Sequence, residues 1–502
     1  RSTQAKTLFP YTTLFRSVFR VGSVSKQFIA TAIALLASQP GCSCNHAAQA
    51  QSCELDSDCP ASACLKGELP FCIDHTCLCS ADIPAGQIGP YAKVAVAPDG
   101  GIWVSAYARS HGDLVVAHVT GAGRITDDAW EWVDGVPSGP VTVPGSVIRR
   151  GIEDAGPDVG MYTSIAVAPD GVPTVAYFDR DTASLRLAQK VGGVWQTHVV
   201  DAGTGTLTGA TGTLAGMFAS LTLRTDDGRP GIAYLAHVKD ATGTRAEVRF
   251  RSAQVAHPTS AADWQGWVVD RAALPPVDPA NPPVFPLPEG LGAFVDAARL
   301  PNQAPVVAYY DRAAGDLKLA RFNAQTGQFA APRVLDGAGG VDAGWQPAIA
   351  VDKTGVVHVA YGGSTGAQLR YVTDTSGATP VVVDDGYRLD GTSVDGVARP
   401  VFHLVGNDAG IVLPPNGAGP IVVYQDSTTQ ELLLAHKQPD GAWAHTSLAG
   451  ATSPWPGGYG FYAAAAAGKD QLALSTWVIN VPSSDAWNSN WVEVFTRPIN
   501  IP

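Results

Sequence analysis

One pattern of short apolar segments recurs along most of the chain. The clearest copy, Tyr162 to Asp201, reads YTSIAVAPDGVPTVAYFDRDTASLRLAQKVGGVWQTHVVD. It holds an apolar segment, a glycine turn, a second segment ending in Tyr-x-Asp, a third segment and a fourth that begins near a Trp. Seven such units follow one another at a spacing of roughly 50 to 75 residues, which indicates a fold built from one repeated supersecondary unit. The other units begin near Tyr91, Phe218, Phe294, Gln346, Phe402 and Phe461.

The residue pattern within a unit predicts four β-strands. The first two segments, such as SIAVA at 164–168 and VVAYY at 306–310, are apolar on both faces, as expected of strands covered on both sides. The third segments alternate, as in Leu185-Arg186-Leu187, which suits a strand nearer to solvent. A Pro-Asp-Gly turn joins the first two segments of two units. We therefore expect an all-β chain.

Residues 91–497 resemble a seven-bladed β-propeller, similar in kind to sialidase-like and other repeat propellers of secreted bacterial proteins. The resemblance implies four-stranded blades around a central axis, in a domain of residues 81–502, with six or eight blades as alternatives. The sialidase motif Ser-x-Asp-x-Gly-x-Thr-Trp matches none of the units. The last unit lacks an obvious fourth strand, and a segment around residues 83–88 is our candidate to complete it.

The first 40 residues carry signals that do not belong together. Residues 1–17 resemble the translation of a sequencing adaptor, and we interpret them as an artefact. Residues 18–39 resemble the start of the active-site helix of class C β-lactamases, so that the chain is interpreted as chimeric. The resemblance implies Ser23 as the nucleophile and Lys26 as its activating base. We expect this Ser-x-x-K to be non-functional, because the remaining parts of such a site are missing. Residues 18–40 also fit a signal-like segment, with 28–37 as its apolar part.

All 8 cysteines lie between Cys42 and Cys79, in a segment of residues 41–80 that is too small and polar to bury a core. We predict disulfides within this module, which places the protein outside the cytoplasm, secreted or at the cell surface, with a lipid anchor as one option. Zinc is the rival interpretation, although no pair of C-x-x-C knuckles is present. The predicted disulfide set is Cys53, Cys59, Cys64, Cys72, Cys77 and Cys79.

Charge and motifs exclude several classes of function. The net charge of -12 disfavours nucleic acid or an anionic membrane as a partner, and no apolar run is long enough for a transmembrane helix. HExxH, P-loop and G-x-S-x-G motifs are absent, so catalysis is not indicated. We expect no cofactor, a monomer, and a carbohydrate or protein ligand. Calcium held by Asp179 and Asp181 is a further candidate.

Loop length selects one face of the predicted propeller. The long connectors 135–161, 202–217 and 271–293 all join a fourth strand to the next first strand, on the rim that also carries the second-to-third loops. Long loops on a rigid scaffold commonly carry binding residues. On this rim a Gly-x-aromatic pattern recurs at the entry to the first strand. Its aromatic residues are Tyr91, Tyr162, Phe218, Phe294 and Tyr462, with Trp345 as a variant directly after Gly344.

Two interpretations of these residues stay open. The aromatic residues either stack against a ligand at the mouth of the channel or pack between blades. The acids that end the second strands either contact a ligand, together with the arginines beside them, or accept hydrogen bonds from turn amides. These candidates are Asp179, Arg180, Asp311, Arg312 and Asp426.

The sequence thus predicts a secreted or surface-tethered bacterial propeller that binds a carbohydrate or protein on its long-loop face. A sialidase-like glycoside hydrolase or lyase that uses rim carboxylates is one alternative. A structural surface protein without a ligand is the other.

Overall fold

In the computed structural model the chain forms two compact units, residues 1–83 and 84–502. The structure describes residues 58, 70–73, 76–79, 87–137, 156–205, 211–274, 290–363, 367–392, 397–450, 457–479 and 490–499. The adaptor-like and β-lactamase-like segments predicted over residues 1–40 lie outside these ranges. In the described residues, no helix is both long enough and apolar enough to cross a bilayer.

The first unit contributes one antiparallel hairpin, β1 (Pro70–Ile73) and β2 (Thr76–Cys79). Cys77 in β2 is disulfide-bonded. The side chains of the other five cysteines in the predicted set lie outside the described residues, so that set stays a prediction.

In the described part of the second unit, seven antiparallel sheets each provide a four-stranded blade, which confirms the predicted propeller of seven blades. Blade 1 consists of β3 (Lys93–Val96), β4 (Ile102–Ala108), β5 (Asp113–Val119) and β7 (Trp130–Asp134). Blade 2 consists of β8 (Val159–Val167), β9 (Pro173–Asp179), β10 (Ser184–Val191) and β11 (Val194–Asp201). Blade 3 consists of β12 (Gly212–Leu223), β13 (Pro230–Asp240), β14 (Gly243–Ala253) and β15 (Trp264–Ala273).

The later blades repeat this order. Blade 4 consists of β16 (Leu291–Arg299), β17 (Pro305–Asp311), β18 (Asp316–Asn323) and β20 (Arg333–Asp336), with the short β19 (Gln328–Phe329) also paired to β18. Blade 5 consists of β21 (Ala343–Val351), β22 (Val357–Gly363), β23 (Gln368–Thr373) and β24 (Val381–Asp384). Blade 6 consists of β27 (Val405–Val412), β28 (Ile421–Asp426), β29 (Glu431–Lys437) and β30 (Trp443–Ala449). Short 3-10 turns lie at Asp127–Ala129 and Ala261–Asp263.

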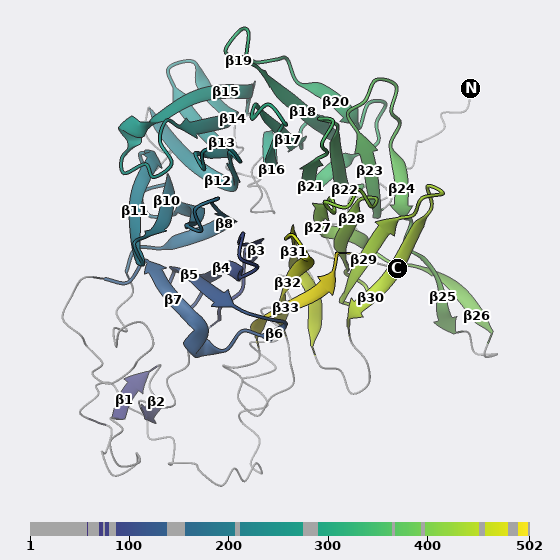
Figure 1. Ribbon diagram of the computed structural model, residues 1–502, viewed down its shortest axis with the longest axis horizontal. Coiled ribbons are helices and arrows are strands. Elements are labelled where there is room, and N and C mark those ends of the chain that lie inside the picture. The colour runs from purple at the N-terminus through teal and green to yellow at the C-terminus, as the bar shows by residue number, and fades with distance from the viewer. Residues whose placement is uncertain are drawn as a thin grey trace, which may run out of the picture. The chain divides into compact units, whose positions relative to one another are not determined.

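The first strand of every blade is the innermost, and each contacts the first strands of both neighbouring blades (Figure 1). The apolar core lies between blades rather than inside one sheet. One cluster joins Leu185 and Leu187 of blade 2 to Ile232 and Tyr234 of blade 3. Both faces of the middle strands are therefore covered, which explains why their sequences are apolar on both sides.

Blade 7 is completed by a strand from the other end of the domain. It consists of β31 (Gly458–Ala467), β32 (Gln471–Ile479), β33 (Trp491–Pro498) and β6 (Gly123–Arg124). The expectation that residues 83–88 complete this blade is wrong, because Ile88 forms an isolated bridge to Ala108 in blade 1. A strand as short as β6 has no recognisable sequence pattern.

A separate two-stranded hairpin is inserted between blades 5 and 6. It consists of β25 (Tyr387–Thr392) and β26 (Ala398–Phe402). In Figure 1 it lies outside the seven sheets. Its side chains include Tyr387, Leu389 and Phe402, which are large, apolar and exposed.

Candidate functional site

The predicted Gly-x-aromatic pattern lies at the entry to the first strand in blade 1, where Tyr91 precedes β3, and within the first strand in blades 2, 3, 4 and 7. In blade 2, Gly160 and Tyr162 are part of β8, and each lies at a shift in the register with β9, between Val159 and Met161 and between Met161 and Ser164. Both have positive φ, 101° and 54°. Gly160 is required because a Cβ there would lie 2.8 Å from the Leu114 backbone of the preceding blade. A positive φ is uncommon for an aromatic residue and costs of the order of 1 kcal/mol or more.

The aromatic side chains form a continuous row around the axis. Their ring centroids are 5.1 Å apart for Tyr462 and Tyr91, 4.7 Å for Tyr91 and Tyr162, and 4.6 Å for Tyr162 and Phe218. The row continues to Phe294 at 4.9 Å and then to Trp345 at 4.7 Å. Each ring is thus partly covered by its neighbours, which is the geometry of packing between blades. Stacking of a ligand on this row stays a prediction.

Two residues complete the ring of equivalent positions, and sequence reasoning missed both. Gln346 and Asp408 have the positive φ, 46° and 49°, that the aromatic residues have in the other five blades. Trp345 therefore precedes the equivalent position instead of occupying it. The signal was available, because Gly344 and Gly406 keep the same spacing to Gln346 and Asp408.

Asp408 joins the inner strands of three blades. The Gln346 side-chain amide donates to its Oδ1 at 2.7 Å, and the Tyr462 backbone amide donates to its Oδ2 at 3.0 Å. Burial raises the pKa of this carboxyl, an effect that these hydrogen bonds and the charge of Lys93 partly offset. Asp296 has an equivalent role, since it accepts from the Ser220 hydroxyl at 2.7 Å and the Ile349 amide at 2.8 Å.

The acids at the ends of the second strands accept hydrogen bonds from the turns that follow. Asp179 accepts from the Thr182 amide at 2.9 Å, and Asp426 accepts from the Thr428 amide at 2.9 Å. Asp311 accepts in the same way from the Ala313 amide at 3.2 Å. Arg180 is 66% exposed and pairs with Asp158, whereas the backbone amide of Arg312 donates to Gly290.

The two predicted calcium ligands, Asp179 and Asp181, both interact with groups of the protein. Asp179 pairs with Arg186 at 3.2 Å, and Asp181 accepts from the Asp158 amide at 3.0 Å. No cluster of three or more His, Cys, Asp or Glu residues suited to a metal occurs in the described part of the chain. Calcium binding stays a prediction.

A buried tyrosine on the second strand links each of blades 2 to 6 to the preceding blade. Its hydroxyl donates to an aspartate at or near the end of the preceding fourth strand, and we call each pair a blade clasp. Burial raises the pKa of these tyrosines, so the hydroxyls keep their protons and act as donors. The clasps are Tyr177–Asp134 at 2.6 Å, Tyr234–Asp201, Tyr309–Asp270 at 2.6 Å, Tyr361–Asp336 at 2.7 Å and Tyr424–Asp384 at 2.7 Å.

A cation on the third strand accompanies four of the five clasps. It stands directly opposite the clasp tyrosine in the strand register and pairs with the clasp aspartate. In blade 2, Arg186 lies 3.2 Å from both Asp134 and Asp179. The other three cations are Arg249 in blade 3, Lys318 in blade 4 and Arg370 in blade 5.

Blade 6 departs from this pattern, because Leu433 stands opposite its clasp tyrosine, Tyr424. Arg388 of the inserted hairpin supplies the cation instead. It binds Asp384 at 2.8 Å and lies 3.9 Å from Asp426, whose side chain is only 1% exposed. Burial alone would raise the pKa of Asp384, but the hydrogen bonds from Arg388 and the Gly386 amide outweigh it and lower that pKa.

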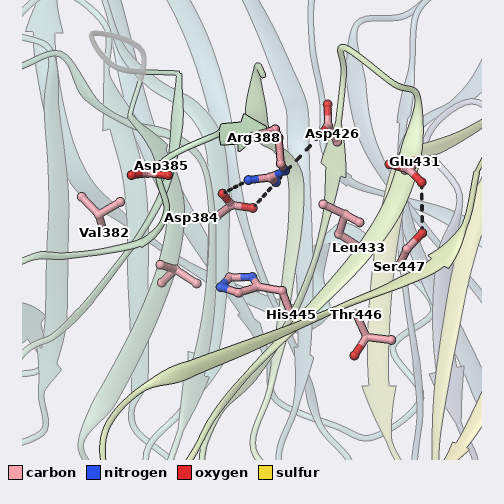
Figure 2. A pocket seen from close by; sticks show the side chains of 11 residues that line it. Val382, Asp384, Asp385, Arg388, Asp426, Glu431, Leu433, His445, Thr446 and Ser447 are labelled. Atoms are coloured by element: carbon pink, nitrogen blue, oxygen red, sulfur yellow. Dashed lines mark hydrogen bonds and ion pairs between the residues drawn. The ribbon is translucent and has the colours of Figure 1, made fainter. Parts of the chain in front are cut away.

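A cavity of about 640 Å³ lies beside Leu433, between blades 5 and 6 (Figure 2). Its volume is typical of sites for small molecules. Asp384 ends β24 and Asp426 ends β28, so the cavity lies on the rim that carries the long connectors. Desolvation lowers the pKa of His445 in its wall, which keeps this imidazole neutral at pH 7. The lining also includes Asp385, Glu431, Thr446 and Ser447.

Of the lining residues, only Asp426 was predicted from the sequence as a candidate site residue. The connector of residues 385–404 could have indicated this site, because it is comparable in length to the three long connectors named above and carries the inserted hairpin. The other signal was Leu433, at a position where four units have Arg or Lys.

No family model and no curated protein matches the chain. Among solved structures, it is similar to a protein of unknown function from Dyadobacter fermentans, with 11% identity, 83% of this chain and 96% of that one covered, and a TM-score of 0.41. It is also similar to puromycin hydrolase, with 15% identity, 82% of this chain covered and a TM-score of 0.46, and it spans 53% of that protein. A β-1,3-galactosidase of family GH43 shows 11% identity, 57% and 92% coverage and a TM-score of 0.32. Similarity at this level carries no argument about function.

Proposed function

We propose that this propeller is a secreted or surface-tethered bacterial protein that binds carbohydrate, and that the ligand occupies the cavity between blades 5 and 6. The observation that carries the proposal is the cavity itself, on the rim with the long connectors. Its wall combines carboxylates, a guanidinium and the hydroxyls of Thr446 and Ser447, groups that hydrogen-bond to sugar hydroxyls. The adjoining hairpin exposes Tyr387 and Phe402, at 44% and 71%, as apolar faces for a sugar ring.

We propose binding without catalysis because the buried carboxylates are already occupied. Asp384 accepts from Arg388 and Tyr424, and Asp426 accepts from turn amides and pairs with His403 at 2.6 Å. With these partners, neither the Asp384 nor the Asp426 carboxylate is placed to act as a general acid or base toward a ligand. Release of reducing ends from a bound glycan would favour the hydrolase alternative instead.

A glycan array probed with the full chain tests the proposal. We expect saturable binding that Tyr387→Ala weakens at least tenfold, whereas Val194→Ala, at an even more exposed apolar residue on blade 2, leaves binding unchanged. Loss of binding in Tyr162→Ala with no effect of Tyr387→Ala would move the site to the aromatic row. Silence of the folded protein across the array would refute carbohydrate binding and favour a protein ligand or a structural role.

The proposed location outside the cytoplasm rests on the cysteine pattern of residues 41–80. Mass spectrometry of the protein purified without reductant measures it directly. We expect masses two hydrogens lower for every disulfide formed, and eight free thiols after denaturation would contradict the proposal.

A further inference from the structure

The cavity lies where the other clasped blades place a cation. In blades 2 to 5 the residue opposite the clasp tyrosine is Arg or Lys, and its charged group binds the clasp aspartate. In blade 6 this residue is Leu433, which is buried and uncharged. The volume that a long cationic side chain fills in the neighbouring blades is therefore left to the cavity.

The charges around this cavity do not balance. Arg388, its one permanent cation among the lining residues, is committed to Asp384 and Asp426. Glu431 accepts from the hydroxyls of Thr429 at 2.8 Å and Ser447 at 3.2 Å, and Asp385 accepts from the Tyr387 amide at 2.9 Å. Neither Glu431 nor Asp385 forms an ion pair within the described part of the chain. His445 adds no charge at neutral pH.

We propose that the ligand supplies a second cation, as the partner of Glu431, and that it is an amino sugar with a free ammonium group. The inference rests on the proposed function and deepens it. The ammonium occupies the volume beside Leu433 and donates to Glu431, while the sugar hydroxyls contact Thr446 and Ser447. An ammonium has three donors and no acceptor, which suits a wall with this excess of carboxylate. N-acetylation would remove the charge and reduce the donors to one.

Calorimetric titration of the full chain with two tetrasaccharides tests the proposal. One is a β-1,4-linked glucosamine tetramer, and the other is the same tetramer with every amine acetylated. We expect the free amine to bind at least tenfold more tightly, a ratio that corresponds to about 1.4 kcal/mol, because the hydrogen bond from the ammonium to Glu431 joins two charged groups. Glu431→Gln should remove most of that preference.

Leu433→Arg provides the sharpest variant because it restores the residue type found in blades 2, 3 and 5. We expect it to abolish binding of the glucosamine tetramer, while Leu433→Met, which keeps the volume without charge, leaves binding within about twofold. Melting temperatures of both variants show whether the blade stays folded. A Leu433→Arg protein that is folded and still binds the tetramer would refute the proposed position.

The outcomes separate the two proposals. Equal binding of both tetramers overturns the ammonium inference and leaves carbohydrate binding intact. No binding of these tetramers or of any other glycan would overturn both the proposed carbohydrate binding and the ammonium inference. Competition by spermidine at equal concentration also overturns the amino-sugar inference, because an amine without a sugar would then suffice.

Discussion

The clasp tyrosines have the largest fully buried side chains of the propeller, and each carries a hydroxyl that water cannot reach. Burying such a hydroxyl is favourable only when it has a hydrogen-bond partner. The aspartate that accepts it belongs to the preceding blade, so one residue contributes both apolar packing and a directional link between two sheets.

Tyr309→Phe tests the strength of one clasp. We expect the free energy of unfolding to fall by about 1–3 kcal/mol, because Asp270 loses its hydroxyl donor inside the interface between blades 3 and 4. Urea denaturation measures the change. Tyr387→Phe, on the exposed hairpin, is the control and should be neutral. Equal effects of the two substitutions would show that the clasp adds nothing.

His237 on β13 makes stability depend on pH. Desolvation lowers its pKa from 6.5 to about 4, so the unfolded chain takes up a proton more readily than the folded one. Its contribution is complete above pH 6.5 and is lost as the pH falls toward 4, by up to about 3 kcal/mol. We expect the melting temperature of His237→Gln to fall less between pH 7 and pH 4.5 than that of the unaltered protein. Parallel pH profiles would contradict this assignment.

The inserted hairpin, β25 and β26, contributes a charged side chain to the neighbouring blades. Its Arg388 compensates two buried carboxylates, Asp384 at the end of β24 in blade 5 and Asp426 at the end of β28 in blade 6. Asp390 strengthens this link, since it lies 3.1 Å from Nε2 of His403, whose other nitrogen contacts Asp426. The hairpin therefore belongs to the wall of the cavity and is more than a surface loop.

Arg388→Met should destabilise the protein by about 3 kcal/mol, because Asp384 and Asp426 would stay buried without their cation. Arg180→Met is the matched control, since it also breaks an Arg–Asp pair but at an exposed site, and it should cost less than about 1 kcal/mol. Chemical denaturation of both variants compares them. A loss no greater for Arg388→Met than for Arg180→Met would mean that the hairpin does not hold blade 6.

At the scale of the whole molecule, the ring closes where blade 7 accepts β6. The strand β6 is two residues long, with Gly123 and Arg124 opposite Val494 and Glu493 of β33, and Arg124 lies over the Trp491 ring at 4.6 Å. The described clasps join blades 1 to 6 in succession, and none of them lies at the two junctions of blade 7. We therefore expect the ring to open first at blade 7.

Ile125→Ala tests this expectation. Ile125 is buried against Val492 and Val494 of β33, and its backbone amide donates to Val492 at 2.9 Å. Truncation should cost about 2–4 kcal/mol. Hydrogen exchange should then show that amides of blades 7 and 1 lose protection before those of blades 3 and 4. Uniform loss of protection in all seven blades would show that the ring unfolds as one unit.

The sequence by itself determined the features that depend on residues close together in the chain. Strands apolar on both faces, Pro-Asp-Gly turns and the repeat period predict the blades and their number, since each is encoded within one unit. The turn at Asp99 behaves as predicted, with the Gly101 amide donating to the Asp99 side chain at 2.9 Å. Asp179 could likewise be interpreted as a turn acceptor, because its donors lie a few residues away.

The tertiary structure alone decided the features that join units distant in sequence. The closure by β6, the acceptors of the clasp tyrosines and the replacement of a third-strand cation by Arg388 each pair residues from different repeats. Leu433 looks like an ordinary strand residue until its equivalents in the other blades are superposed by their register. Such pairings depend on how whole blades pack around the axis, and local sequence patterns carry no record of that packing.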